Sequence, residues 1–148
     1  MDPVSICLSF ALTLLPADHP VRWGCVLAGI DATRSEAFAL ADPERLREVY
    51  ARGSELRGVD RAVMEGYSDR GLRVRSFTMT VSDLRVISQS GSHVVLRVVD
   101  RVDHLSVVDE RGAQVRVPND LPTARLLALR REHGAWRIDR STDEEQPR

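Results

Sequence analysis

The chain of 148 residues contains no lysine, and all 21 of its basic residues are arginine. They are balanced by 22 acidic residues, which leaves a formal net charge of −1. Without a positive excess there is no electrostatic basis for binding a phosphate backbone, so we expect no nucleic-acid partner. Because the planar guanidinium group pairs well with carboxylates, we expect many Arg–Asp and Arg–Glu pairs.

Cysteine is also scarce, with only Cys7 and Cys25 present, and two cysteines do not make a disulfide framework in a chain this long. Both lie in apolar, helix-like segments, and we expect two small buried thiols rather than a disulfide. No histidine or cysteine pair has the spacing of a zinc site, and no glycine-rich loop precedes a helix. We therefore expect neither a metal nor another cofactor.

The length suits one domain, and we divide the chain into an N-terminal apolar segment (1–20), a domain (21–141) and an acidic tail (142–148). The run from Val4 to Leu15 is apolar but short, since a membrane-spanning helix takes about 20 apolar residues. Three interpretations stay open for it: a buried or interface helix, an atypical export signal, or the outer end of a membrane anchor. A membrane-associated or exported location is therefore weighed equally with a cytoplasmic one.

Helical periodicity and capping residues predict three helices in the first half of the chain. Asp18 or His19 can cap the first helix, with Pro20 in its first turn. An aspartate before a proline begins the second helix, and a serine can cap the third. The predicted ranges are Trp23–Ala41, Asp42–Gly53 and Ser54–Gly71.

After Gly71 the apolar pattern changes from helical to alternating, which predicts strands. The first strand has slips near Ser76 and Ser82, typical of a bulged and curved strand. The predicted strands are Leu72–Val86, Ser92–Asp109, Gln114–Val117, Ala124–Glu132 and Ala135–Arg140. Helices followed by hairpin-connected strands indicate an α+β fold, with a cone-like curved antiparallel sheet packed against three N-terminal helices.

Several short segments, in a fixed order between about Val21 and Ser141, carry a family resemblance. They are Ala41-Asp42-Pro43 before Leu46 and Val49-Tyr50, Gly53-Ser54, Tyr67 to Gly71 with Leu72-Arg73-Val74, Val98-Val99-Asp100-Arg101, and Gly134-Ala135-Trp136-Arg137-Ile138. In this order the chain resembles the nuclear-transport-factor-2-like superfamily, and within it an uncharacterised actinobacterial branch. The resemblance implies a pocket inside the cone, and often a dimer or a second domain. The superfamily holds steroid isomerases, polyketide cyclases, dehydratases and non-enzymatic binding domains without a common catalytic motif, so no catalytic residue is carried over.

The second long strand supplies the candidate site residues. Its even positions from Val94 onward are the more apolar set, which should face the core and direct Asp100 and His104 inward. The two side chains would lie about 13 Å apart along the strand. Asp100 can then serve as a general base with a raised pKa, or it can pair with an arginine such as Arg130 and fix the strand register. A bulge between the two residues would reverse the faces.

The aromatic residues offer fewer candidates. Tyr67 can reach the pocket as a hydrogen-bond donor, although such a tyrosine is more often a core residue whose hydroxyl lies at the surface. Trp23 is a large apolar anchor. Trp136 suits the core or a dimer interface better than a stacking platform.

These patterns favour a non-catalytic ligand- or protein-binding domain. We expect it to self-associate as a homodimer or to bind a protein partner, and a small apolar ligand is a further expected partner. The alternative is a small-molecule isomerase, cyclase or dehydratase that uses a pocket carboxylate, with Asp100, His104 and Tyr67 as candidates. We lean against an enzyme. An open cavity of a few hundred cubic ångströms with a raised-pKa carboxylate would favour one. Membrane association through Val4 to Leu15 is a further expectation.

Overall fold

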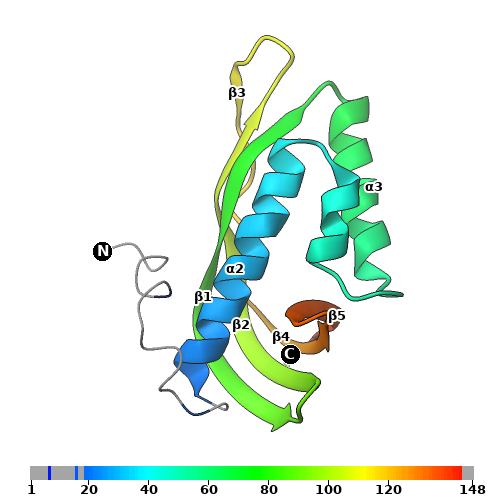
Figure 1. Cartoon of the computed structure of the whole chain (residues 1–148). Coiled ribbons are helices and arrows are strands. Elements are labelled where there is room, and N and C mark those ends of the chain that lie inside the picture. Colours follow the sequence, from blue (N-terminus) through cyan, green and yellow to red (C-terminus); the bar gives the residue numbers. More distant parts are fainter. Residues whose placement is uncertain (1–6, 8–15, 17–18, 145–148) are drawn as a thin grey trace.

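A computed structural model describes Cys7, Pro16 and residues 19–144. Within this part of the chain, helices pack against a curved, unclosed antiparallel sheet of five strands, which confirms the predicted α+β class (Figure 1). The elements are α2 (Pro20–Ala39), η2 (Pro43–Glu48), α3 (Leu56–Asp69), β1 (Arg73–Gln89), β2 (His93–Val108), β3 (Gln114–Val115), β4 (Thr123–Glu132) and β5 (Ala135–Asp143).

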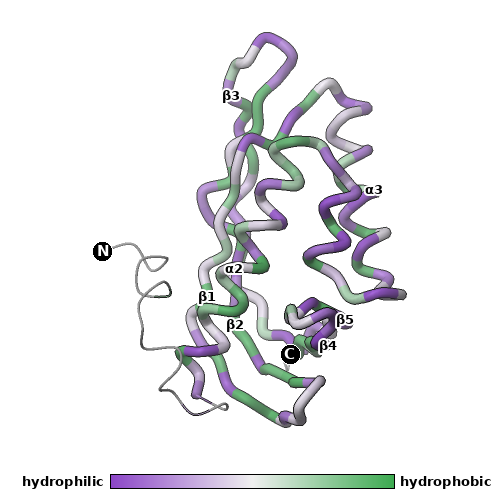
Figure 2. Tube along the Cα trace, viewed as in Figure 1, coloured by the Kyte–Doolittle hydropathy of each residue, from purple (hydrophilic) through white to green (hydrophobic). Residues whose placement is uncertain are grey.

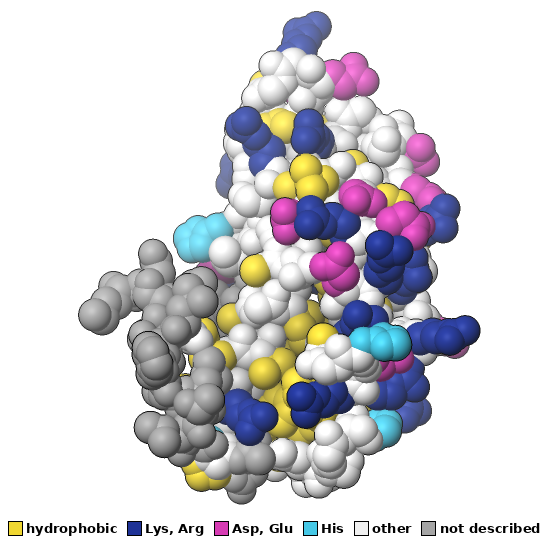
Figure 3. Space-filling view, in the orientation of Figure 1, with side chains coloured by type: hydrophobic (Ala, Val, Ile, Leu, Met, Phe, Trp, Pro, Cys, Tyr) yellow, Lys and Arg dark blue, Asp and Glu magenta, His cyan; other side chains and the backbone are white. Residues whose placement is uncertain are grey.

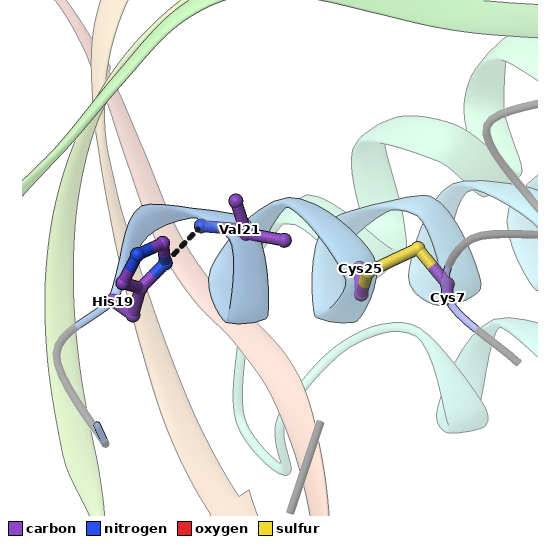
Figure 4. The surroundings of a disulfide bond; sticks show 4 residues. All are labelled: Cys7, His19, Val21 and Cys25. Carbon is purple, nitrogen blue, oxygen red and sulfur yellow. Dashed lines mark hydrogen bonds between the residues drawn. A yellow bond between two sulfur atoms is a disulfide. The ribbon is translucent and has the colours of Figure 1, made fainter. Parts of the chain in front are cut away.

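Both ends of α2 are capped by side chains. Nδ1 of His19 accepts a hydrogen bond from the amide of Val21 at 3.2 Å, as predicted for His19 (Figure 4). The other predicted cap, Asp18, lies outside the described residues. At the far end Arg73 donates to the carbonyl of Ala39 at 2.9 Å, which places a positive charge at the negative pole of the helix.

The second predicted helix is a 3₁₀ helix and is shorter than expected. The side chain of Asp42 caps it by accepting from the amide of Glu44 at 3.0 Å. The following backbone then pairs with the last strand instead of continuing the helix. The amide of Ile138 donates to Val49 at 2.9 Å, and the amide of Ala51 donates to Ile138 at 2.8 Å. The strand competes for the same backbone groups, which ends the helix.

The sheet has the strand order β1-β2-β4-β5, and β3 pairs with the end of β2. Register shifts near Ser76 and between Val81 and Asp83 confirm the predicted slips in the first strand. Figure 2 shows hydrophilic and hydrophobic residues alternating along β1 and β2. The last strand continues to Asp143, beyond the expected end at Arg140.

The core lies between the helices and the inner face of the sheet. Trp23 contacts Trp136 edge to face, with ring centroids 5.0 Å apart, so Trp136 packs on the core. Phe38 and Phe77 form a second edge-to-face pair at 5.6 Å. The largest fully buried side chains are Trp23, Leu46, Val49, Val94, Leu96, Val98, Val107 and Leu129.

The expectation of two free thiols is wrong, because Cys7 and Cys25 form a disulfide (Figure 4). Their Cα atoms lie 5.3 Å apart although the residues are separated by 18 positions. The bond joins two segments that are distant in the sequence, and no local sequence pattern predicts such a pairing.

No helix within the described part of the chain is long and apolar enough to cross a membrane. Apart from Cys7, the apolar run from Val4 to Leu15 lies outside the described residues. Residues 145–148 of the predicted acidic tail lie outside them as well.

Candidate functional site in the cone interior

Asp100 lies on the inner face of β2, as the alternation predicts, and its side chain is buried. The Nε atom of Arg125 lies 2.9 Å from its Oδ1. Asp100 is opposite Thr123 on β4, two residues before Arg125, so the arginine comes from the neighbouring strand. The expected ion pair is present, but its partner is not Arg130, which lies instead 3.6 Å from Glu132.

The pKa of Asp100 is raised, first because burial disfavours the charged carboxylate. Arg125 lowers it, while the negative charges of Asp120 and Asp143 raise it further. The contact with Arg125 is an ion pair without the alignment of a good hydrogen bond. Protonation of Asp100 would break this ion pair, so the residue has a structural role in holding β4 against β2.

The prediction that His104 points inward is wrong, because its side chain is exposed. The backbone of His104 has a positive φ of 49°. Between the paired positions Asp103 and Ser106, β2 has one more residue than β1, which is a bulge. The extra residue reverses the inner and outer faces, so the odd-numbered Val107 is buried beyond it.

Tyr67 is half-buried and lines a cavity of about 150 Å³ together with Val74. The guanidinium group of Arg70 lies 5.0 Å from the centre of its ring. Val74 is seven residues along β1 from Val81, the residue opposite Asp100. At about 3.3 Å per residue, Tyr67 and Asp100 lie about 20 Å apart along the sheet. Asp100, His104 and Tyr67 therefore do not form one site.

A different polar cluster occupies the interior between α2, α3 and the chain after η2. Arg34 donates to both carboxylate oxygens of Asp60, from Nε at 2.6 Å and from Nη2 at 2.8 Å. The hydroxyl of Tyr50 donates to the same carboxylate at 2.6 Å. The guanidinium group also lies over the rings of Phe38, at 5.5 Å, and Phe77, at 5.2 Å. Asp60 is thus a fully paired buried carboxylate, and this cluster fixes α3 against α2.

Two members of this cluster, Arg34 and Tyr50, have raised pKa values. Burial alone lowers the pKa of Arg34, but the hydrogen bond to Asp60 and the charges around the guanidinium group together outweigh burial, so the pKa is raised. Burial also raises the pKa of the Tyr50 hydroxyl, and the charge of Asp60 adds to the effect. Arg34 therefore stays charged and Tyr50 stays neutral across the ordinary pH range.

Asp31 lies one turn of α2 before Arg34 and is half-buried. Burial is the main cause that raises the pKa of its carboxyl to about 7. Arg34 lowers this pKa, and the charge of Asp100 raises it. A carboxyl that is half protonated near neutral pH can accept or donate a proton there.

The sequence alone did not single out Arg34 or Asp31 as candidate site residues. A usable signal was present, since Arg34 is four residues after Ile30 and four before Phe38, both on the buried stripe. Asp31 follows Leu27 by four residues. Residues at these spacings share a helix face, so both charges fall at the edge of the buried face.

Among the described residues, no three His, Cys, Asp or Glu side chains lie close enough together to hold a metal ion. The exposed His104 lines a surface groove of about 780 Å³, beside Asp103 and Asp120. In the part of the chain that the structure describes, the interior holds the charged groups of Asp31, Arg34, Asp60, Asp100 and Arg125.

No protein-family model matches the sequence, and no curated protein matches it. The intermembrane-space region of the chloroplast protein ARC6 is 15% identical with a TM-score of 0.54, covering 86% of this chain and 98% of that one. A candidate calcium/calmodulin-dependent protein kinase II association domain from Xanthomonas campestris is 16% identical with a TM-score of 0.53, covering 90% and 92%. Aln2 from a Streptomyces species is 14% identical with a TM-score of 0.53, covering 82% and 89%.

These identities are low, so the matches report on fold and not on activity. They show a shared fold, and membership of the nuclear-transport-factor-2-like superfamily stays a prediction. Assignment to an actinobacterial branch stays a prediction.

Proposed function

We propose that the chain is a non-catalytic binding domain that self-associates through the outer face of its sheet. The observation that carries the proposal is an apolar patch on the face opposite the helices. Val95 pairs with Ala128 across β2 and β4, and Val99 pairs with Ala124. Leu126 lies between these two pairs on β4. All five are only half-buried in the single chain, and a second copy would cover them.

The charged residues beside this patch are already paired within the chain. Arg97, opposite Leu126, lies 3.3 Å from Asp83 and 3.0 Å from Glu144. Asp83 also lies 3.6 Å from Arg85. Because these charges are matched inside one protomer, a partner surface can approach the patch without leaving a charge unpaired.

A solved structure with the same fold gives further support. The similar protein from Xanthomonas campestris is itself named as a candidate association domain. The name of that protein suggests that a domain of this fold can associate. In the present chain, the apolar patch on β2 and β4 is the surface that would do so.

Sedimentation velocity of the purified protein tests the proposal, with Leu126→Arg as the disruptive variant. We expect a wild-type dimer and a Leu126→Arg monomer. Val59→Arg is the matched control, because Val59 is 57% exposed on α3, away from the patch. Figure 3 shows basic and acidic side chains interleaved over α3, where another arginine should be tolerated. A wild-type monomer, or a Leu126→Arg dimer, would contradict the proposal.

A second candidate is an isomerase, cyclase or dehydratase that uses a carboxylate of the cone interior, and one specific observation favours it. The carboxyl of Asp31 has a pKa raised to about 7, mainly by burial, and it lies near Asp100. This is the range in which a general base works best. Figure 3 shows apolar side chains gathered between α2 and β5, a surface that suits the approach of an apolar ligand.

Native mass spectrometry of gently purified protein separates the two candidates. A small-molecule adduct that leaves on denaturation would give the ligand mass and favour an occupied interior. Loss of the adduct in Asp31→Asn, but not in the control Asp69→Asn on the exposed end of α3, would place the ligand beside Asp31. A dimer without adduct would favour the association domain alone.

We also propose that the domain works in an oxidising compartment. Disulfides form and persist outside the reducing cytosol, and the Cys7–Cys25 bond is therefore expected in an exported or membrane-exposed protein. Lysis of cells directly into denaturant that contains a thiol-reactive polyethylene glycol measures this state. Two modified cysteines without prior reduction would contradict the proposal, and none would support it.

A further inference from the structure

Between Val21 and Ala32, helix α2 has a second face without charge, on the side away from the sheet. Residues on this side recur at intervals of three and four positions, as one face of a helix requires. The water-facing side of a surface helix normally carries polar or charged residues. An uncharged stripe therefore indicates that another segment packs against this side of the helix. We call it the outer stripe; its members are half-buried or exposed, and they are Val21, Cys25, Ala28, Gly29 and Ala32.

The disulfide is an independent observation that points to what covers the stripe. Cys25 lies in the stripe, and its sulfur is bonded to the sulfur of Cys7 (Figure 4). Cys7 belongs to the uncharged run from Val4 to Leu15. The covalent bond therefore holds one residue of this run against the outer stripe.

The other end of the run is fixed as well. The carbonyl of Pro16 accepts a hydrogen bond from the amide of His19 at 3.0 Å, directly before α2. His19 and Cys25 are six residues apart, about 9 Å along a helix. The nine residues from Cys7 to Pro16 span at most about 30 Å when extended. The run is therefore tied to α2 at Cys7, and the residue that follows it, Pro16, is held directly before the helix.

The stripe itself suits close approach by another segment. A Cβ atom placed at Gly29 would meet no described atom within 4 Å. Small side chains let two segments pack at short distance, and large apolar side chains on one of them fill the space. The run supplies such side chains in Leu8, Phe10 and Leu12.

We propose that the run from Val4 to Leu15 packs on the outer stripe of α2 as a permanent part of the folded domain. The Cys7–Cys25 disulfide attaches the run to the helix. This inference does not depend on the proposed self-association, which uses the opposite side of the sheet. It also decides among the three interpretations of the run. Removal of the run as an export leader would leave Cys25 unpaired and the stripe bare, and insertion into a membrane would draw it away from α2.

Hydrogen exchange of the full-length, oxidised protein tests this inference, read by mass spectrometry on peptides from the run. We expect the amides between Leu8 and Leu15 to exchange at least ~100-fold more slowly than in an unstructured peptide. Val21→Glu places a charge in the stripe between His19 and Cys25, and we expect it to speed this exchange at least ~10-fold. An acidic residue in the first turn of α2 favours the helix, so the fold should persist.

The matched control is Val59→Glu, an equally apolar and exposed site on α3, which should leave exchange of the run unchanged. Exchange of the run at the rate of a free peptide in the wild type would overturn the proposal. Equal protection in Val21→Glu and Val59→Glu would overturn it too. Protection that develops only after addition of phosphatidylglycerol vesicles would make a membrane the occupant and would also refute it.

Discussion

The carboxyl of Asp31 offers a direct measure of how well the cone interior excludes water. Burial raises its pKa from 3.8 to about 7, against the opposing charge of Arg34. Between these two pH values the folded state keeps a proton that the unfolded state has lost, so the free energy of unfolding falls as pH rises. One pKa unit corresponds to about 1.4 kcal/mol, and the whole shift to about 4 kcal/mol. Because Asp31 is only half-buried, solvent reduces this, and we expect about 2–4 kcal/mol.

Replacing Asp31 with asparagine removes the titrating proton and keeps the shape of the side chain. The variant should therefore gain stability relative to wild type as pH rises from about 4 to about 8, by about 2–4 kcal/mol. Urea denaturation followed by circular dichroism at several pH values measures this difference. Asp69→Asn, at the exposed end of α3, is the control and should leave the pH dependence of the wild type unchanged.

A constant difference between wild type and Asp31→Asn across this pH range would refute the reasoning. The folded-state pKa of Asp31 would then be ordinary, and water would reach the carboxyl freely. The candidate enzyme would lose its best-placed base in the same experiment.

Three further variants test the interior and one turn. Asp60→Ala leaves the Arg34 guanidinium without its carboxylate and should lower the free energy of unfolding by about 3–5 kcal/mol in urea denaturation. Tyr50→Phe removes only one hydrogen bond to Asp60 and should cost about 1.5–3 kcal/mol; a larger loss than for Asp60→Ala would contradict the central place of that carboxylate. Gly71→Ala puts a side chain at φ +66°, with its Cβ 2.8 Å from Oε1 of Glu110. Since that carboxylate can move, we expect a loss of about 1–2 kcal/mol, and unchanged thermal stability would show that the turn can relax.

The helices and strands could be predicted because each has a local cause. Each of the signals used comes from residues close together in the sequence: the apolar spacing on α2, the capping by His19 and the change to alternation after Gly71. The 3₁₀ character of η2 could not be predicted, because Asp42 and Pro43 start either kind of helix. What ends it is the pairing of Ala51 with Ile138, a contact across the chain.

The candidate site was harder to predict for the same reason. Alternation correctly directs Asp100 inward, but its partner depends on the register of β2 against β4, which places Arg125 and not Arg130 beside it. The outward turn of His104 depends on one extra residue in β2, at a position with a positive φ that no glycine marks. The Cys7–Cys25 bond depends on the return of a distant segment.

Asp31 is also the interior residue at which the two proposed functions predict different effects of a substitution. Asp60 is held by Arg34 and Tyr50, and Asp100 is held by Arg125, so each of these carboxylates has a structural partner. At Asp31 burial outweighs the nearby arginine, which is why the pKa rises to about 7. A domain that only associates through its outer sheet face does not need a titrating carboxyl in its interior. Asp31→Asn should therefore leave its self-association unchanged. A domain that moves a proton inside the cone would lose activity with asparagine at this position while its fold became more stable above neutral pH.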